Sequence, residues 1–444
     1  EIKIFGKAPD PIYIGTGGYT IGRVDNTIVR DPLNRVPKIP GSSLAGTWRF
    51  YSSLHVQGKW ADIDHCWSNL KQDESIKRFI TFYSDQLEKQ GMDIKDKKNF
   101  IKRLEESDFR KLILRLRNVY WDNGKKDWHE FWTDFWGKFE KFKEEIVQDK
   151  NTKQIVDQLY ANQAIIKHSI YSTIHCAGQD ELPNQEIKEG EEETIKGHCG
   201  RCIICTSFGY SKNTHSWQGI LFFSDLEIIL FPVYTQYGTK WITTEEKLNH
   251  VIDHVRDHIK GDKWGYRYDE SEKDFINLGW LNIKVKPSHR ANGTYIIEED
   301  LLQDNGSNHG GQKNDGERDQ LTIDAKDIVV VSDKVFNQVV NANLEVRTSV
   351  SIDPLTGTAR DGHLFTSEAI PRGTIFYGNI RVFDKSIFTR GLFPDIQMVE
   401  HLLLNSKSYF ETLGIGGLTT RGFGRMKVIL NRQKIRFNEG DIGV

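Results

Sequence analysis

Cysteine, methionine and long apolar runs are scarce in this chain of 444 residues. It has five cysteines and three methionines, and it contains no run of about 18 apolar residues, so no transmembrane helix is expected. Its first ten residues, EIKIFGKAPD, lack the basic and apolar segments of a signal peptide, which predicts a cytoplasmic protein. Lysine and arginine number 60 against 62 acidic residues, giving a formal net charge of −2. Any contact with RNA or DNA must therefore come from local arginines and lysines.

The order of the apolar segments predicts an α+β fold. Strands are expected near 3–14, interrupted at Pro9 and Pro11, and again within 219–233 and 373–383. A helix is expected to start with Ser42 or Ser43 as its N-cap, and a second one over 395–410. This sequence of elements suits a modified ferredoxin-like (RRM-like) sheet packed on two helices and enlarged by insertions.

Composition divides the chain into four parts. The predicted core begins at 1–59, is interrupted by a charge-rich and tryptophan-rich helical insertion at 60–168 and by a cysteine-bearing insertion at 169–215, and continues over 216–444. The helical block is either a self-contained bundle or a lobe that docks a partner or RNA. Acidic residues 177–197 and polar residues 300–319 are predicted surface loops.

The cysteine motif predicts a structural metal site. Three cysteines with C-x2-C-x2-C spacing can direct their thiolates at one tetrahedral ion: Cys199, Cys202 and Cys205. Cys176 is the best fourth ligand, with His198 and His175 as alternatives. We expect zinc, because an odd number of clustered cysteines does not suit a disulfide framework. The remaining cysteine, Cys66, is expected to be buried and inert.

A glycine-rich segment, LGIGGLTTRGFGRM at 413–426, precedes the last predicted strand. Glycine backbones can approach a phosphate closely, and Arg421 and Arg425 supply positive charge. The segment lacks the Gly-Lys-Ser/Thr ending of the phosphate-binding loop of nucleotide hydrolases, and it leads into a strand rather than a helix. It is therefore either a contact to a nucleic-acid backbone or a tight connection.

Two further segments can reach a ligand. Pro37 and Pro40 precede a helix start at Gly41-Ser42-Ser43, where backbone N–H groups bind an anion or are simply capped, and Arg49 lies two turns further on. Residues 343–371 form a long polar hairpin with a DPLTG turn, a type of element that commonly reaches out of a domain.

These segments together resemble the RAMP superfamily of CRISPR-associated proteins, in particular the repeating backbone subunit of type III effector complexes of the Cmr type, related to the Csm type. The resemblance is carried by VDNTIVRDPLNRVPKIPGSSLAGTWR, GILFFSDLEIILFPVYTQYGTKWIT, the hairpin region, GIGGLTTRGFGRMKV and HCGRCIICTSFG. It covers about the first 55 residues and most of 170–435, but not the helical block.

The resemblance implies a subunit that binds a guide CRISPR RNA along its phosphates, stacks with further copies and other subunits, and wedges a thumb-like hairpin into the guide–target duplex. Asp25 matches the acid that promotes cleavage of the target RNA, with magnesium or manganese as the expected cation. The implied RNA-binding residues are Arg23, Arg30, Ser42, Ser43, Arg49, Arg347, Thr348, Gly416, Gly417, Arg421 and Arg425.

Three functions remain open at this point. The first is a guide-dependent endoribonuclease, and the second is a non-cleaving scaffold in which Asp25 only caps a loop. The third, a standalone guide-processing ribonuclease, suits the chain less well because its first histidine, His55, lies outside the opening loop. Two departures from the family pattern are Ala45, where a lysine is frequent, and Asn26-Thr27, where a proline is frequent after the aspartate.

Overall fold

The fold is that of a computed structural model, which describes residues 1–17, 24–69, 102, 174–178, 198, 202–212, 215–252, 264–288, 291, 293–299, 320–385, 396–432 and 436–438. Nearly all of the predicted helical insertion and of the predicted loop 177–197, and all of the predicted loop 300–319, lie outside these residues. So do Arg23, Cys199 and the side chains of Cys66 and His175.

The chain divides into two compact units. The first comprises 1–47, 223–381 and 407–444, and the second comprises 48–222 and 382–406. No helix in the described part of the chain has the length and apolar character needed to span a membrane.

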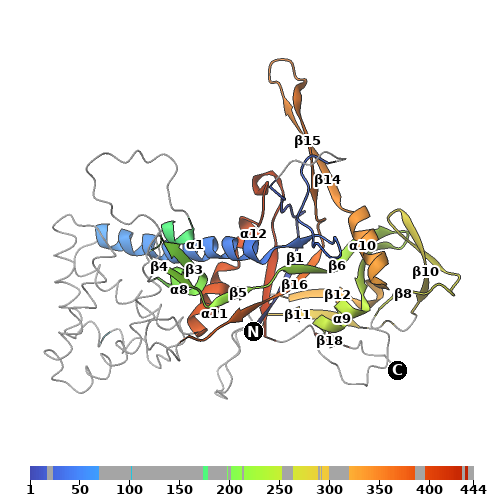
Figure 1. Ribbon diagram of the computed structural model, residues 1–444, viewed down its shortest axis with the longest axis horizontal. Coiled ribbons are helices and arrows are strands. Elements are labelled where there is room, and N and C mark those ends of the chain that lie inside the picture. Colours follow the sequence, from blue (N-terminus) through green and yellow to red (C-terminus); the bar gives the residue numbers. More distant parts are fainter. Residues whose placement is uncertain are drawn as a thin grey trace. The chain divides into compact units, whose positions relative to one another are not determined.

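A long mixed sheet forms the centre of the first unit (Figure 1). In spatial order its strands are β17 (Lys427–Asn431), β1 (Ile2–Lys7), β16 (Ile375–Val382), β6 (Leu226–Thr235), β7 (Gly238–Thr244), β13 (Ile328–Val331), β8 (Tyr266–Tyr268), β10 (Leu281–Pro287) and β9 (Phe275–Leu278). The first four are antiparallel to their neighbours, whereas β13 is parallel to both β7 and β8. The predicted α+β class is confirmed.

Apolar side chains of these strands build the core. In β1 and β6, which read IKIFGK and LEIILFPVYT, most of the apolar positions are buried. Phe5 and Tyr377 pack with their ring centroids 5.2 Å apart. A second sheet, of β12 (Gln320–Asp324), β11 (Thr294–Glu298) and β18 (Arg436–Asn438), adds Tyr295 and Ile323 to the same cluster. Each large side chain that is fully buried contributes about 1.5–3 kcal/mol to this core.

Short helices follow the parallel strands. Thr244 caps α9 (Glu245–Val251), accepting a hydrogen bond from the N–H of Lys247 at 3.2 Å. The helix α10 (Asp333–Ala342), which was not predicted from the sequence, buries Phe336, Val339 and Val340. Smaller elements of this unit are β2 (Lys38–Ile39), the 3-10 helices η3 (Ala325–Asp327) and η4 (Thr419–Arg421), and α12 (Tyr409–Thr412).

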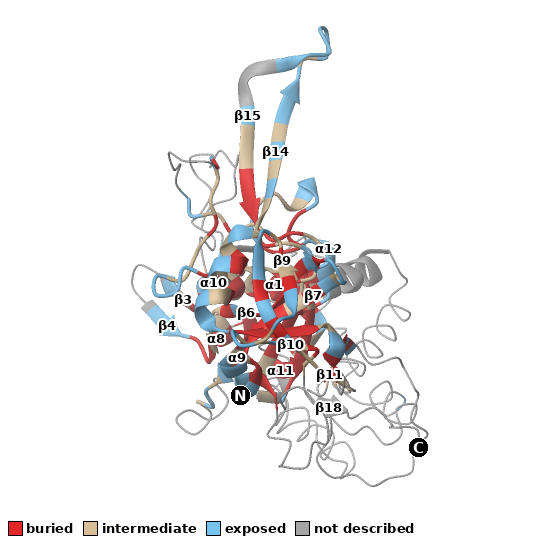
Figure 2. Ribbon diagram, turned by 90° about the vertical axis from the view of Figure 1, so that its right-hand side faces the viewer, coloured by how far each residue is buried: buried red, intermediate tan, exposed pale blue. Residues whose placement is uncertain are grey.

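The segment 343–371 forms a long hairpin of β14 (Glu345–Ile352) and β15 (Ala359–Ala369) that projects from the first unit (Figures 1 and 2). In the DPLTG turn, Asp353 Oδ1 accepts from the N–H of Leu355 at 2.8 Å, and Gly357 has φ 68°. Figure 2 shows that β15 is buried at its base and that the hairpin becomes exposed towards its tip.

The second unit contains the remaining elements. The helix α1 (Gly41–Asn69) starts in the first unit and continues into this one. Trp48 of α1 is fully buried, and its indole N–H donates to Ser406 Oγ of α11 (Ile396–Ser406) at 3.0 Å. Around the cysteines lie η2 (Ile174–Ala177), α8 (Ile203–Phe208) and the paired strands β3 (Gly209–Lys212) and β4 (His215–Gln218), while β5 (Leu221–Phe223) follows at the unit boundary.

Candidate RNA-binding and metal sites

Asp25 lies exposed at the base of the hairpin. Its Oδ2 accepts hydrogen bonds from the backbone N–H of Thr366 at 2.8 Å and from the Thr366 hydroxyl at 2.9 Å. The Thr366 N–H, followed by the hydroxyl, lowers the pKa of Asp25, so the carboxylate is ionised at neutral pH. Within the described part of the chain, Asp25 Oδ1 has no hydrogen-bond partner. Sequence reasoning missed Thr366, because no local pattern connects residues 341 positions apart.

Arg30 is engaged by protein groups. Its guanidinium forms an ion pair with Glu368 at 2.7 Å, donates to Asn341 Oδ1 at 3.1 Å, and donates to the carbonyl of Ile28 at 3.2 Å. The side chain is 19% exposed. This geometry makes Arg30 a connection between the Asp25 segment, β15 and α10, and it leaves little of the guanidinium for RNA.

The glycine-rich segment folds against residues 11–13. The N–H of Gly417 donates to the carbonyl of Tyr13 at 3.0 Å, and the N–H of Gly424 donates to that of Pro11 at 2.8 Å. Gly416 has φ 86°, and a Cβ there would lie 2.2 Å from the Tyr13 carbonyl oxygen. Gly424 has φ 90°, and a Cβ there would lie 2.7 Å from the Ile415 carbonyl oxygen. Both glycines are therefore required by a close approach of protein backbone.

Arginines join this segment to the hairpin. Arg347 donates to the carbonyl of Gly422 at 3.3 Å, and its guanidinium lies 4.7 Å from the ring centroid of Phe423. Arg421 lies over the ring of Phe365 in β15 at 5.8 Å. Thr348 is exposed on β14, directly opposite Thr366. The base of the hairpin thus brings together three sequence segments that were predicted separately: the Asp25 loop, the hairpin and the glycine-rich segment.

Arg425 forms an ion pair with Asp10, with Nη2 to Oδ1 at 2.9 Å and Nε to Oδ2 at 2.5 Å. Its side chain is 54% exposed, so the guanidinium still faces solvent. The Arg425 guanidinium lowers the pKa of Asp10.

The start of α1 differs from the expected cap. The N–H of Leu44 donates to the carbonyl of Pro40 at 3.0 Å, so Pro40 occupies the N-cap position and Ser42 and Ser43 lie in the first turn. The prediction that a serine caps this helix was wrong. The N–H of Gly41 donates instead to Asp225 Oδ1 at 2.7 Å, a long-range contact that the sequence did not reveal.

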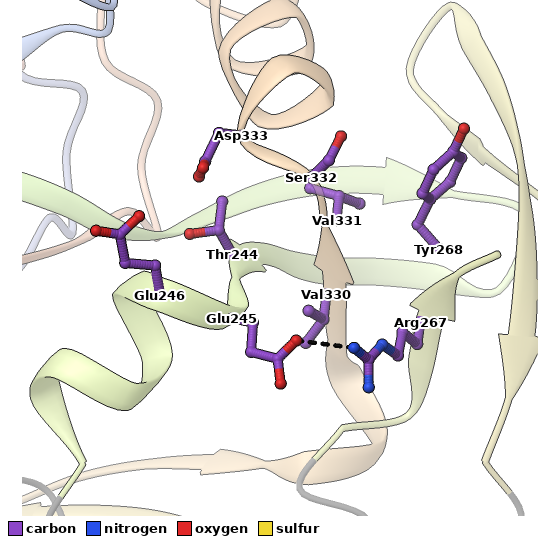
Figure 3. A pocket seen from close by; sticks show the side chains of 9 residues that line it. All are labelled: Thr244, Glu245, Glu246, Arg267, Tyr268, Val330, Val331, Ser332 and Asp333. Carbon is purple, nitrogen blue, oxygen red and sulfur yellow. Dashed lines mark hydrogen bonds and ion pairs between the residues drawn. The ribbon is translucent and has the colours of Figure 1, made fainter.

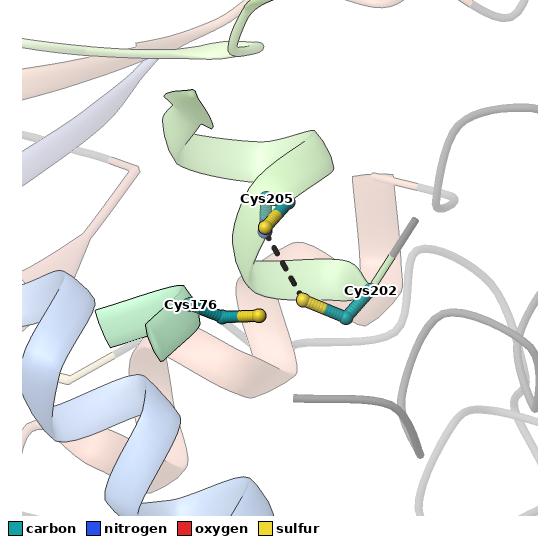
Figure 4. Close-up of side chains that lie close together, drawn as sticks. All are labelled: Cys176, Cys202 and Cys205. Atoms are coloured by element: carbon teal, nitrogen blue, oxygen red, sulfur yellow. Dashed lines mark hydrogen bonds between the residues drawn. The ribbon is translucent and has the colours of Figure 1, made fainter. Parts of the chain in front are cut away.

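Three cysteines form a buried cluster in the second unit (Figure 4). The sulfurs of Cys176, Cys202 and Cys205 lie within 4.8 Å of one another. Zinc–sulfur bonds of ~2.3 Å in a tetrahedral site place sulfurs about 3.8 Å apart, so the donor set fits a zinc ion. Cys202 also accepts a hydrogen bond on sulfur from the N–H of Cys205 at 3.4 Å, which stabilises a thiolate. Cys199 is not among the described residues.

Arg49 donates its hydrogen bonds to residues at and next to this cluster, and not to an anion at the start of α1. It donates to the carbonyl of Cys176 at 2.7 Å, to the carbonyl of Gly209 at 2.6 Å, and to Nδ1 of His198 at 3.1 Å. A guanidinium only donates, so Nδ1 accepts, and a neutral imidazole then carries its proton on Nε2. Nδ1 of His198 is thus engaged by Arg49, and among the described residues only the three cysteines bring their ligand atoms together.

A separate pocket of about 300 Å³ lies where β7 and β13 end and α9 and α10 begin (Figure 3). Its lining includes three acids, Glu245, Glu246 and Asp333, and one arginine, Arg267, which pairs with Glu245 at 2.8 Å. The excess of acids makes it unsuited to RNA phosphates. None of the residues predicted to bind RNA or metal lines it.

A family model described as the RAMP superfamily matches residues 7–427. The chain belongs to the RAMP superfamily. This confirms the resemblance drawn from the sequence.

Two curated proteins match parts of this RAMP protein. It is 43% identical over 60 residues to the CRISPR system Cms endoribonuclease Csm3 of Enterococcus italicus, covering 13% of this chain and 28% of the relative. It is 33% identical over 103 residues to the CRISPR system Cmr endoribonuclease Cmr4 of Pyrococcus furiosus, covering 23% of this chain and 32% of the relative. The matched regions thus span less than a third of either relative.

Similar solved structures include oligomeric Cmr4 from Pyrococcus furiosus, with 13% identity over 97% of both chains and a TM-score of 0.36. A type III-B Cmr-beta structure in the apo state matches at 13% identity, also over 97% of both chains, with a TM-score of 0.39. Values this low support no comparison of individual residues.

Proposed function

We propose that this RAMP protein is a backbone subunit of a type III CRISPR complex, which binds guide RNA and cleaves complementary target RNA at regular intervals. The relatives named Csm3 and Cmr4 support this assignment. So does the antiparallel order β17-β1-β16-β6, with α1 between β1 and β6 in the chain and α11 between β16 and β17. That connectivity is the one expected of a ferredoxin-like (RRM-like) core. Further copies of the chain and other subunits would be its partners, in the cytoplasm.

The hairpin suits the role of a thumb. Five of its apolar side chains are exposed: Val346 at 46%, Val350 at 44%, Ile352 at 61%, Leu355 at 95% and Leu364 at 64%. An isolated hairpin gains nothing from presenting such side chains to water, whereas apolar side chains wedged between base steps unstack nucleic acid. The hairpin base also carries Arg421 and Thr348, which can contact the RNA backbone.

Guide binding is assigned to the start of α1 and to the glycine-rich segment. Ser42 is exposed and Ser43 partly exposed in the first turn of α1, where their N–H groups can receive a phosphate. Arg421 and Arg425 are exposed in the glycine-rich segment and would supply positive charge to the guide backbone. Arg30 and Arg49 contribute through the protein groups they hold, because their guanidinium groups are already hydrogen-bonded.

The observation that carries the proposed cleavage is an exposed, ionised carboxylate with one unbonded oxygen at the base of the hairpin. A flipped target nucleotide frees its backbone to bring the 2′-OH in line with the phosphorus. The lowered pKa makes Asp25 a weak base and suits it to hold a hydrated divalent cation, magnesium or manganese. Such a cation, when bound, would stabilise the negative charge that develops on the phosphate.

A non-cleaving scaffold is the second candidate. The same contacts with Thr366 would then make Asp25 a capping carboxylate of the loop. The two functions share every RNA contact and differ only in the chemistry at Asp25.

Asp25→Ala in the assembled complex separates them. We expect target-RNA affinity to stay within about twofold while the cleavage rate falls by roughly a hundredfold or more. Removing divalent ions with a chelator should have the same effect on the wild type. The control is Asp333→Asn, which alters another exposed acid that lines the separate pocket. Unchanged cleavage by Asp25→Ala would point to another catalytic group, whereas a wild-type complex that binds target RNA without cleaving it would favour the scaffold.

We assign the cysteine cluster to a structural zinc site of Cys176, Cys199, Cys202 and Cys205. Its support is the set of three clustered cysteines that the structure describes, all of which are buried. The site would stabilise the insertion at 169–215, and bound zinc is measured directly by elemental analysis of the purified protein.

A further inference from the structure

Thr366 and Asp25 form a reciprocal pair. The Thr366 hydroxyl donates to Asp25 Oδ2 at 2.9 Å and accepts the N–H of Asp25 at 3.1 Å, while the Thr366 N–H donates to the same Oδ2 at 2.8 Å. One hydroxyl can make both bonds because it has one donor and two acceptor sites. The carboxylate is therefore fixed in one orientation by a single residue of β15.

Backbone hydrogen bonds extend this attachment. The N–H of Asn26 donates to the carbonyl of Thr366 at 3.0 Å, and the N–H of Glu368 donates to the carbonyl of Asn26 at 3.0 Å. These bonds make Asn26 a parallel bridge partner of Ser367. The Asp25 segment is thus joined to the base of the hairpin by a parallel β-bridge, and the ion pair of Arg30 with Glu368 attaches the same segment a second time.

The second oxygen of the carboxylate takes no part in these bonds. Oδ2 takes both hydrogen bonds from Thr366, whereas Asp25 Oδ1 accepts none within the described residues. Without Thr366, an exposed aspartate samples several rotamers, and its oxygens spend most of their time elsewhere. With Thr366, the position of Oδ1 follows the position of the hairpin.

We infer that Thr366 is a positioning residue that fixes the reactive carboxylate of Asp25 to the thumb-like hairpin, so that seating the hairpin in the guide–target duplex places Asp25 for cleavage. This inference rests on the proposed cleavage by Asp25. It explains why residue 25, in the loop before α1, belongs structurally to a hairpin that follows some 320 positions later in the chain.

The test is Thr366→Val in the complex assembled with guide RNA. Valine keeps the shape and the backbone N–H but removes the hydroxyl. We expect the single-turnover cleavage rate to fall roughly tenfold, with target-RNA affinity unchanged within about twofold. Thr366→Ser, which keeps the hydroxyl, should restore most of the rate. Thr322→Val, the same change at an exposed position of β12, should have no effect.

Hydrogen exchange gives a second readout that does not need cleavage. The N–H of Asp25 bonds to the Thr366 hydroxyl, so the peptide covering 24–30 should exchange faster in Thr366→Val than in the wild type or in Thr322→Val. Unchanged exchange together with unchanged cleavage would overturn the role of Thr366.

The outcomes also separate this inference from the proposed function. If wild type cuts and Asp25→Ala does not, but Thr366→Val cuts like wild type, the positioning role is wrong and the cleavage proposal stands. If Asp25→Ala cuts like wild type, the cleavage proposal is wrong, and faster exchange in Thr366→Val would leave only a structural attachment of the loop.

Discussion

Replacement of Arg49 tests the link between α1 and the cysteine cluster. Its guanidinium donates to the carbonyls of Cys176 and Gly209 and to the ring of His198, at 2.7, 2.6 and 3.1 Å. Cys176 and Gly209 are both buried, so Arg49→Ala leaves two buried carbonyl groups without this donor. Each such group costs about 1–3 kcal/mol.

Arg49 is itself only half-buried, so water can replace part of the hydrogen bonding that the two carbonyl groups lose. The expected loss in the free energy of unfolding of the second unit is therefore about 2–4 kcal/mol. Arg49→Lys should lose only slightly less stability than Arg49→Ala, because one ammonium group cannot replace the three hydrogen bonds that the guanidinium donates. The control is Arg267→Ala, which removes an exposed ion pair with Glu245 and should cost about 1 kcal/mol or less.

Two assays measure the effect. Urea titration gives the free energy of unfolding, and elemental analysis with a chelator gives the zinc content and the rate of zinc release. We expect Arg49→Ala to release zinc faster than wild type. An Arg49→Ala protein that matches wild type in both stability and zinc release would refute the linking role. A wild type without zinc would refute the metal site, while the urea titration would still test the contribution of Arg49 to stability.

The remaining predictions concern the glycine-rich segment. Gly416→Ala should destabilise the protein by about 2 kcal/mol or more, because φ is 86° and the new Cβ meets the Tyr13 carbonyl. Gly46→Ala, which lies in open space within α1, should instead stabilise it by about 0.5–1 kcal/mol. Equal changes in the free energy of unfolding, measured in urea, would contradict this account. Arg425 lowers the pKa of Asp10, so their ion pair contributes stability above the ordinary carboxyl pKa of about 4 and loses it as the pH falls through the lowered value. The free energy of unfolding of Asp10→Asn should therefore be lower than that of wild type by at most about 1 kcal/mol at pH 7, and the two values should converge in acid. A difference that stays constant at every pH would contradict a stabilising ion pair.

Local patterns in the sequence determined the class of fold and its main segments. Runs such as LEIILFPVYT predict buried strands because alternating or continuous apolar residues must face a core, and DPLTG predicts a turn through aspartate and glycine. The C-x2-C spacing of Cys202 and Cys205 predicts shared ligation for the same local reason. The resemblance to the RAMP superfamily likewise depends on short motifs.

Only the tertiary structure decided what each polar side chain contacts. Thr366 binds Asp25, Asp225 caps α1, and Arg49 holds Cys176 and Gly209, in each case across more than 100 positions of the chain. An arginine in a sequence does not reveal whether its guanidinium will find protein carbonyls or RNA phosphates, because both satisfy the same donors. The packing of the chain decides between them, and here Arg30 and Arg49 donate to protein groups. The same packing leaves one oxygen of Asp25 without a protein hydrogen bond in the described part of the chain.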